Sequence, residues 1–449
     1  MNTLPPQLSP DLFEWGCATS SFQIEGAGTL GGRVPSVWDD FCAQPGRILD
    51  GSNGLVACDH YHRFASDVAL IAQLGFKHYR FSIAWPRVMT ANNQLNHEGL
   101  DFYKRLLDAL EQHHITPNAT LFHWDLPSHL PGGWLARDTA YRFADYAALV
   151  AQHLGDRLPR VATLNEPWCT AFLGHDVGVF APGVQHRPSA LLAAHHLMLG
   201  HGLAVQAWRS QRAGTQLGIV LNPELCDPAA STSPEAQAAN MQAAQMAEME
   251  RNDCFLNPLF GRPWPDALEQ QIGQQSAERQ EGDLQTIAQP LDFMGLNYYT
   301  RSIAQAPASA QDKQRGYRFV PPAAGLSTTD IGWEIYPEGL GRMVRNLTRH
   351  WPLPPLWITE NGAADNTPLA DGQCQDTMRW HYLQTHLSEM AQLIAQGSDI
   401  RGYYAWSLLD NFEWAHGYSQ RFGLVHVDFA SQTRTPKHSA LMLQKLLLS

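Results

Sequence analysis

The segment DHYHRFASDVALIAQLGFKHYRFSIAWPR, residues 59–87, contains the pattern that decides the fold. Within Asp59–Leu74, apolar residues recur at spacings of three and four, which predicts a helix with one buried face. The run His78–Ile83 then combines aromatic and β-branched residues, which predicts a short buried strand. Aromatic and charged residues follow directly at Trp85–Arg87. The segment is therefore a helix followed by a strand, with polar side chains just beyond the strand.

Similar strands and helices alternate along the whole chain. The predicted strands are Phe13–Ala18, His78–Ile83, Ala119–Phe122, Val161–Leu164, Leu217–Leu221, Phe293–Leu296, Leu356–Thr359 and Gly402–Trp406. The predicted helices are Asp59–Leu74, Glu98–Glu111, Ala140–Leu154, Ser189–Arg212, Pro234–Asp253, Glu338–His350, Asp376–Gln396 and Lys437–Leu448. This alternation predicts an α/β fold, a single (β/α)8 TIM barrel whose long βα loops form the active-site face. An open doubly wound sheet fits less well, because no Gly-rich phosphate-binding fingerprint follows the first strand.

Composition limits the classes of protein. Of the 449 residues, 44% are hydrophobic and 16% are charged, which excludes a disordered chain. A net charge of −12 disfavours nucleic acid and anionic membranes as partners. A typical barrel needs about 250 residues, so about 200 are expected in loops and insertions, including surface insertions at Ala229–Ala247 and Ala304–Arg318. No Pro/Gly/Ser-rich tract divides the chain, so one catalytic domain over residues 1–449 is expected.

The cysteines and the apolar runs concern redox state and location. The seven cysteines contain no C-x-x-C pair, which argues against a disulfide framework and against a zinc site. No signal-peptide core is seen near Met1, and no run approaches the roughly 20 apolar residues that span a bilayer. We therefore expect a cytoplasmic protein, with no metal and no membrane partner.

Polar and aromatic residues follow most of the predicted strands, and in a parallel barrel these positions meet on one face. Two of them are carboxylates, Glu166 and Glu360, after the fourth and seventh strands. These strands are three places apart around a ring of eight, so the two side chains are expected to face each other. Facing carboxyl groups are what glycoside hydrolysis requires, because one protonates the leaving oxygen and the other attacks or activates water. A single strand-end Glu is more often a salt-bridge or capping residue, and it is the pair that indicates catalysis.

Four motifs resemble those of glycoside hydrolase family 1, the β-glucosidases. They are WGCATSSFQIEG at 15–26, TLNEP at 163–167, ITENG at 358–362 and the segment from Trp406 to Trp414. The resemblance runs in order from Phe13 to about Pro436. It implies that Glu166 is the general acid and base, that Glu360 is the nucleophile of a glycosyl-enzyme intermediate, and that configuration is retained.

The resemblance also implies roles for residues around the two carboxylates, without any cofactor. Substrate-binding residues would be Gln23, His123, Trp124, Asn165, Asn297, Tyr299, Trp406, Glu413, Trp414 and Phe422. Asn165 would meet the sugar 2-hydroxyl, Trp406 would form a stacking floor, and Phe422 would close the pocket near the hydroxymethyl group. Arg80 and Tyr299 would orient the nucleophile. Cys169, His175, Asn222 and Trp333 would shape the aglycone side.

The expected substrates are small-molecule β-glycosides, and the expected protein is a monomer or homo-oligomer. Family membership implies hydrolysis of terminal non-reducing β-D-glucosyl residues from cellobiose-like oligosaccharides, as in cellulose degradation, and from aryl or alkyl β-glucosides. β-Galactosides and β-fucosides remain open. A 6-phosphorylated sugar is disfavoured, because the Glu413 carboxylate would repel the phosphate. Two alternatives also remain: a sugar-binding protein without turnover, and a transglycosylase.

Overall fold

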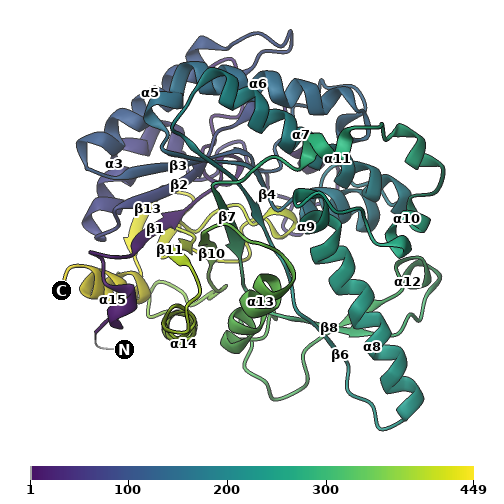
Figure 1. The fold of residues 1–449 in the computed structure, drawn as a ribbon. Coiled ribbons are helices and arrows are strands. Elements are labelled where there is room, and N and C mark those ends of the chain that lie inside the picture. Colours follow the sequence, from purple (N-terminus) through teal and green to yellow (C-terminus); the bar gives the residue numbers. More distant parts are fainter. Residues whose placement is uncertain (1–2) are drawn as a thin grey trace.

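A computed structural model describes residues 3–449 and places a closed parallel barrel at the centre of the molecule (Figure 1). The barrel order is β1-β11-β10-β7-β5-β4-β3-β2. The barrel strands are β1 (Glu14–Ala18), β2 (His78–Ser82), β3 (Thr116–Phe122), β4 (Arg160–Asn165), β5 (Gln216–Leu221), β7 (Phe293–Asn297), β10 (Leu356–Asn361) and β11 (Ile400–Trp406). Each coincides with a predicted strand to within three residues at either end, and the TIM-barrel prediction is confirmed.

Amphipathic helices cover the outside of the barrel. They are α3 (His60–Gln73), α5 (His97–Gln112), α6 (Asp138–Leu154), α7 (Arg187–Gln211), α13 (Pro337–His350), α14 (Thr377–Ala395) and α15 (His438–Leu447). In α13 the buried residues Leu340, Val344 and Leu347 recur at spacings of three and four, as a helix with one apolar face requires. Seven of the predicted helices therefore lie where a TIM barrel needs them.

The one remaining predicted helix, Pro234–Asp253, was counted among the eight barrel helices, and this count was wrong, whereas the expected surface insertion at Ala229–Ala247 agrees with the structure. Its first part, α8 (Pro234–Glu248), extends away from the barrel and packs on a small sheet, as Figure 1 shows. This sheet has the order β6-β8-β9, with β6 (Cys226–Pro228), β8 (Ser302–Gln305) and β9 (Arg318–Val320). α8 packs on this sheet because its narrow alanine face meets Cys226, Ala304 and Tyr317. Together they form a core separate from that of the barrel. The outer layer after β5 is formed instead by α9 (Cys254–Leu259), α10 (Asp266–Ile272) and α11 (Asp283–Ile287), which pack against α7.

The remaining elements are short. The α-helices are α1 (Ser21–Ile24), α2 (Val37–Cys42), α4 (Trp85–Val88) and α12 (Ala310–Arg315), and a hairpin joins β12 (Val425–Asp428) to β13 (Thr433–Pro436). Single 3-10 turns lie at Pro6–Leu8, Gly133–Leu135, Gly155–Arg157, Gly273–Glu278 and Trp414–His416, and π-helical segments at Cys169–Val177 and Met249–Asp253. Over residues 3–449, no helix is both long and apolar enough to cross a membrane. All seven cysteines are free thiols.

Candidate active site

A cavity of about 740 Å³ opens at the carboxyl ends of the barrel strands. Thirteen of the predicted site residues line it: His123, Trp124, Glu166, Cys169, Asn222, Asn297, Tyr299, Trp333, Glu360, Trp406, Glu413, Trp414 and Phe422. Three of them belong to the barrel strands β7, β10 and β11, and the others lie in the connections that follow β3, β4, β5, β7 and β11. The closed ring therefore brings residues nearly 300 positions apart in the sequence around one space.

Glu360, at the end of β10, is held through both carboxylate oxygens. Arg80 Nη1 donates to Oε1 at 2.7 Å, and the Tyr299 hydroxyl donates to Oε2 at 2.7 Å. The side chains of Arg80 and Glu360 are 4% and 5% exposed, so solvent screens this ion pair little. Two hydrogen-bond donors, one of them a cation, therefore fix the position and orientation of the Glu360 carboxylate.

Glu166, directly after β4, has different surroundings. Asn297 Nδ2 donates to Oε1, and the Cys169 thiol donates to Oε2 at 3.1 Å. Burial and, after it, the negative charge of Glu360 raise the pKa of Glu166 to about 7, against the opposing effects of Asn297, Cys169 and Arg80. One carboxyl group is thus paired with a cation while the other has a raised pKa. Such a difference separates an acid from a nucleophile.

Asn165 connects the two carboxylates. Its Oδ1 accepts from Arg80 Nη2 at 2.7 Å and from Asn297 Nδ2 at 3.1 Å, so the donors of Glu360 and of Glu166 meet on one oxygen. Its Nδ2 lies 3.1 Å from His123 Nε2, and its carbonyl accepts from Trp124 Nε1 at 2.9 Å. Because every polar group of Asn165 has a partner, the geometry around the two carboxylates is rigid.

Aromatic rings form one side of the cavity. The His123 ring is stacked on Trp406 with centroids 5.9 Å apart and on Trp414 at 6.1 Å, and Trp124 lies 4.5 Å from Trp414. Flat apolar faces beside polar groups are suited to sugar rings, which have apolar faces and polar edges. Two buried atoms at this wall, His123 Nδ1 and Glu413 Oε2, have no hydrogen-bond partner in the part of the chain that the structure describes.

The carboxyl group of Glu413 is electrostatically coupled to the other two. Burial, followed by the negative charges of Glu360 and Glu166, raises the pKa of Glu413 to about 8. At neutral pH the protonated form of Glu413 is therefore favoured. It is then a hydrogen-bond donor as well as an acceptor toward a hydroxyl group.

Three residues of the site have left-handed backbone conformations that side chains rarely adopt. The φ angles are 43° at Glu166, 78° at Trp124 and 48° at Trp414. Such conformations cost of the order of 1–3 kcal/mol each and occur preferentially at functional sites. Their concentration at one cavity indicates that side-chain placement there takes precedence over backbone relaxation.

Four predicted site residues do not line the cavity. Arg80 donates to Glu360, and Asn165 accepts from Arg80 and Asn297, as described above. Gln23 is fully buried and donates to Asn411 Oδ1 and to the Phe412 carbonyl, both at 2.9 Å, so it supports the loop that carries Glu413. His175 is buried in a π-helical segment, with Nδ1 2.9 Å from the Thr170 carbonyl.

The outer wall contains residues that were not predicted from the sequence. Trp168, Leu173, Phe180, Glu224, Arg251, Tyr298, Arg301, Ile303, Phe319, Val320, Ile331 and Glu334 all line the cavity. The Arg251 guanidinium lies 3.3 Å over the Trp168 ring and pairs with Glu224 at 2.6 Å. Trp168 follows the NEP motif at 165–167, which was a usable signal. Arg251 and Phe319 come from the insertions, where no strand-end position marked them.

The described residues hold no cluster of His, Cys, Asp or Glu with metal-site geometry. The site instead combines one carboxylate held by a cation, one carboxyl group with a raised pKa and a wall for a sugar ring. These groups are suited to acid-assisted displacement at an anomeric carbon.

Comparison with known proteins agrees with this geometry. Residues 6–449 match the family described as Glycosyl hydrolase family 1. The chain is similar to a β-glucosidase from Agrobacterium sp. (strain ATCC 21400), 44% identical over 98% of this chain and 95% of that protein. It is also similar to a bifunctional β-D-glucosidase/β-D-fucosidase from Bifidobacterium breve, 42% identical over 96% of each chain. The virulence factor SghA from Agrobacterium tumefaciens, solved with its substrate analogue salicin, superposes with a TM-score of 0.92 at 44% identity, over 97% of this chain and 95% of that one.

Proposed function

Because this chain belongs to glycosyl hydrolase family 1, we propose that the cavity is the active site of a retaining β-glucosidase. The observation that carries the proposal is the unlike environment of two carboxyl groups that line one cavity. Glu360 is held by Arg80 and Tyr299, while the pKa of Glu166 is raised to about 7. The first fits a nucleophile and the second fits a group that donates and then accepts a proton.

The reaction would proceed by double displacement. Glu360 attacks the anomeric carbon while the Glu166 proton passes to the leaving oxygen, which gives a covalent glycosyl-enzyme and a free alcohol. Glu166, now ionised, takes a proton from water, and this water displaces Glu360 and restores the β configuration. Asn165 and Asn297 hold the frame in which both steps occur.

We assign terminal non-reducing β-D-glucosyl groups as the glycone, with β-fucosides and β-galactosides as further candidates. The relative from Bifidobacterium breve, which is named as both glucosidase and fucosidase, supports the first of these additions. Glu413 argues against 6-phosphorylated sugars, because a carboxyl group stands where a phosphate would need a cation.

The outer cavity favours aryl and alkyl leaving groups, besides cellobiose-like ones. Its wall includes the apolar side chains Leu173, Ile303, Phe319 and Val320. The charged groups there are mostly paired with each other, as in the Arg301–Glu334 pair at 2.8 Å, and offer little to sugar hydroxyls.

We also assign the whole chain to one catalytic domain and, because its seven thiols are all free, to a reducing compartment such as the cytoplasm.

A panel of nitrophenyl glycosides tests the proposed function. We expect nitrophenol release from the β-glucoside with the highest kcat/KM, lower values for the β-fucoside and β-galactoside, and no release from the α-glucoside. Proton NMR at early times should show β-glucose as the first product. A protein that binds these compounds without releasing nitrophenol would instead be a sugar-binding protein, and α-glucose as the first product would contradict retention.

The pH dependence should report on Glu166. Since its pKa is raised to about 7 and the acid must be protonated to act, kcat/KM for octyl β-glucoside should fall as the pH rises through about 7. The Cys169 thiol stabilises the ionised form, so Cys169→Ala should move this decline to higher pH by roughly half a unit. Cys169→Ser keeps a donor and is the matched control, expected to stay near the wild-type profile. An unchanged profile in Cys169→Ala would show that the thiol contact does not affect Glu166.

A further inference from the structure

The loop between β11 and β12 contributes Glu413, Trp414 and Phe422 to the cavity wall. Asp410 lies in this loop and is completely buried. It is not among the residues that line the cavity, and no part of the mechanism above uses it. A fully buried charged group needs several partners, and the identity of those partners indicates what Asp410 does.

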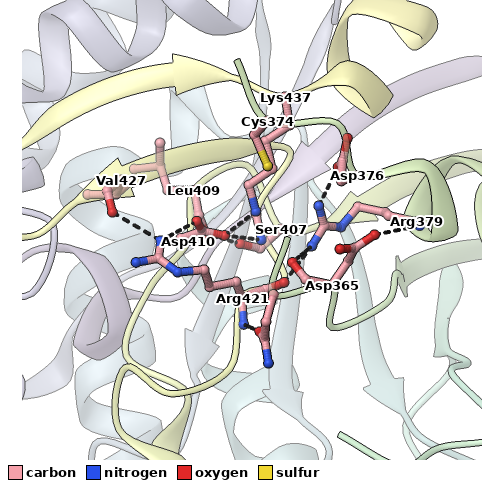
Figure 2. Close-up of polar contacts among 12 residues, drawn as sticks. Asp365, Cys374, Asp376, Arg379, Ser407, Leu409, Asp410, Arg421, Val427 and Lys437 are labelled. Carbon is pink, nitrogen blue, oxygen red and sulfur yellow. Dashed lines mark hydrogen bonds and ion pairs between the residues drawn. The ribbon is translucent and has the colours of Figure 1, made fainter. Parts of the chain in front are cut away.

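The partners of Asp410 are two cations and one backbone amide (Figure 2). Lys437 Nζ lies 2.6 Å from Oδ1, and Arg421 Nη1 lies 2.7 Å from Oδ2. The Gly423 amide also donates to Oδ1, at 3.0 Å. Two of these three contacts are made by Arg421 and Gly423, the residues on either side of Phe422.

Asp410 and Lys437, which are both fully buried, are both charged at neutral pH. Burial alone would raise the pKa of Asp410, but the charges of Lys437, Arg379 and Arg421 lower it below its ordinary value. Burial lowers the pKa of Lys437 to about 8, against the opposing effect of Asp410. The side-chain contacts of Asp410 to Lys437 and Arg421 are thus charge-assisted hydrogen bonds to a fully buried carboxylate.

A second set of bonds holds the backbone of Arg421. Its carbonyl accepts from the Asp365 amide at 3.0 Å and from Arg379 Nη2, and its amide donates to Asn366 Oδ1 at 2.9 Å. Arg379 in turn pairs with Asp376, as Figure 2 shows. Asp365 and Asn366, in the segment after β10, therefore hold the backbone of Arg421, while Asp410 holds its side chain. β10 is the strand that carries Glu360.

Phe422 is the element of the cavity wall that these contacts fix. Its carbonyl accepts from the Ser407 amide at 3.2 Å, and its ring lies 6.1 Å from Tyr299 and 5.8 Å from Trp333 between centroids. Tyr299 is the residue whose hydroxyl donates to Glu360. A shift of Phe422 would therefore move the wall of the sugar pocket and would loosen the packing of Tyr299.

We propose that Asp410 is a positioning residue for the glycone pocket: by binding Arg421 and Gly423 it fixes Phe422 against Tyr299, and so sets selectivity for a sugar that carries a hydroxymethyl group. The inference rests on the proposed function and on the role that the family resemblance implies for Phe422, which is to close the pocket near that group. It predicts that the loss of Asp410 resembles the loss of the Phe422 ring, although Asp410 does not touch the sugar.

The test compares nitrophenyl β-glucoside with nitrophenyl β-xyloside, which lacks the hydroxymethyl group. In Asp410→Asn we expect kcat/KM for the glucoside to fall roughly tenfold and that for the xyloside by less than about threefold, since contacts of this size discriminate by 10- to 200-fold. Phe422→Ala should lower the same ratio. In the Phe422→Ala background, Asp410→Asn should lower kcat/KM for the glucoside by less than about threefold, because Asp410 acts through the Phe422 ring that is already absent.

The matched control is Asp67→Asn. Asp67 is also a buried aspartate on α3, paired with Arg434 at 2.9 Å and with His60 at 2.8 Å, and its side-chain hydrogen bonds go to these two residues, neither of which belongs to the cavity loop. Thermal unfolding should show lower stability in both variants, while only Asp410→Asn changes the glucoside-to-xyloside ratio. Should Asp410→Asn fail to fold, Arg421→Met serves instead, because that side chain is 23% exposed and only one of the three contacts of Asp410 is lost.

The possible outcomes separate the two proposals. Wild-type protein without activity on the glucoside would contradict the proposed function. Active wild-type protein, with both aspartate variants losing activity equally on the two substrates, would overturn the role of Asp410 alone. The role of Asp410 would also be overturned if the losses in kcat/KM for the glucoside caused by Asp410→Asn and Phe422→Ala were fully additive. This second criterion needs only the glucoside, so it applies even if the enzyme does not turn over the xyloside.

Discussion

Replacing Glu360 by glycine is expected to reduce the hydrolysis of nitrophenyl β-glucoside by roughly 10⁴-fold or more, the scale lost when a covalent nucleophile is removed. Sodium azide should restore turnover with an activated substrate such as 2,4-dinitrophenyl β-glucoside. The physical reason lies in the groups that remain. Arg80 and the Tyr299 hydroxyl, which now hold the Glu360 carboxylate, would face the space left by the side chain and attract a small anion.

The product identifies the role of Glu360. Azide entering from the position of Glu360 attacks the face opposite to the leaving group, so α-glucosyl azide is expected by NMR. Glu413→Gly is the matched control, because it also removes a carboxyl group from the cavity wall and should lose activity, yet azide should not restore it. Formation of β-glucosyl azide in Glu360→Gly would show that another group is the nucleophile.

Replacing Glu166 by alanine should produce a loss that depends on the leaving group. We expect roughly a 10³-fold reduction in kcat/KM for octyl β-glucoside and about tenfold or less for 2,4-dinitrophenyl β-glucoside, because dinitrophenolate departs without a proton. A plot of log kcat/KM against leaving-group pKa should be much steeper for the variant than for the wild type.

The same reagent provides the check on Glu166. In Glu166→Ala, azide should intercept the glycosyl-enzyme from the face that water normally uses and give β-glucosyl azide, the opposite anomer to that from Glu360→Gly. Equal losses for good and poor leaving groups would argue against an acid role. Identical azide products from both variants would mean that the two carboxylates do not stand on opposite faces of the sugar.

The sequence predicts the barrel well because its strands are short apolar runs and its helices show apolar residues at spacings of three and four. Buried parallel strands such as β4 are nearly continuous apolar runs, and the residue after such a run, here Glu166, must lie at the rim. The residues of the inner cavity could be predicted for the same reason, because Glu360 and Trp406 both lie at the ends of barrel strands.

The residues of the outer wall of the cavity could not be predicted in this way. Arg251 and Phe319 reach the cavity from insertions whose paths depend on tertiary packing, and no periodic pattern marks them. The helix α8 illustrates the limit. Its helical pattern was correct, but the pattern did not show that its alanine face would pack on a separate sheet and not on the barrel. Likewise, the spacing of Asp410, Arg421 and Lys437 gave no sign that the three side chains meet.

The small sheet with its own core has a consequence for how this protein can change over evolutionary time. Cys226, Ala243, Ala247 and Ala304 pack among themselves, apart from the residues that stabilise the barrel. Mutations in that unit can therefore remodel the entrance, where Ile303 and Val320 stand, without displacing the strands that carry the two carboxylates. Such a division lets a lineage acquire new leaving-group preferences in small steps while its bond-breaking chemistry is inherited intact.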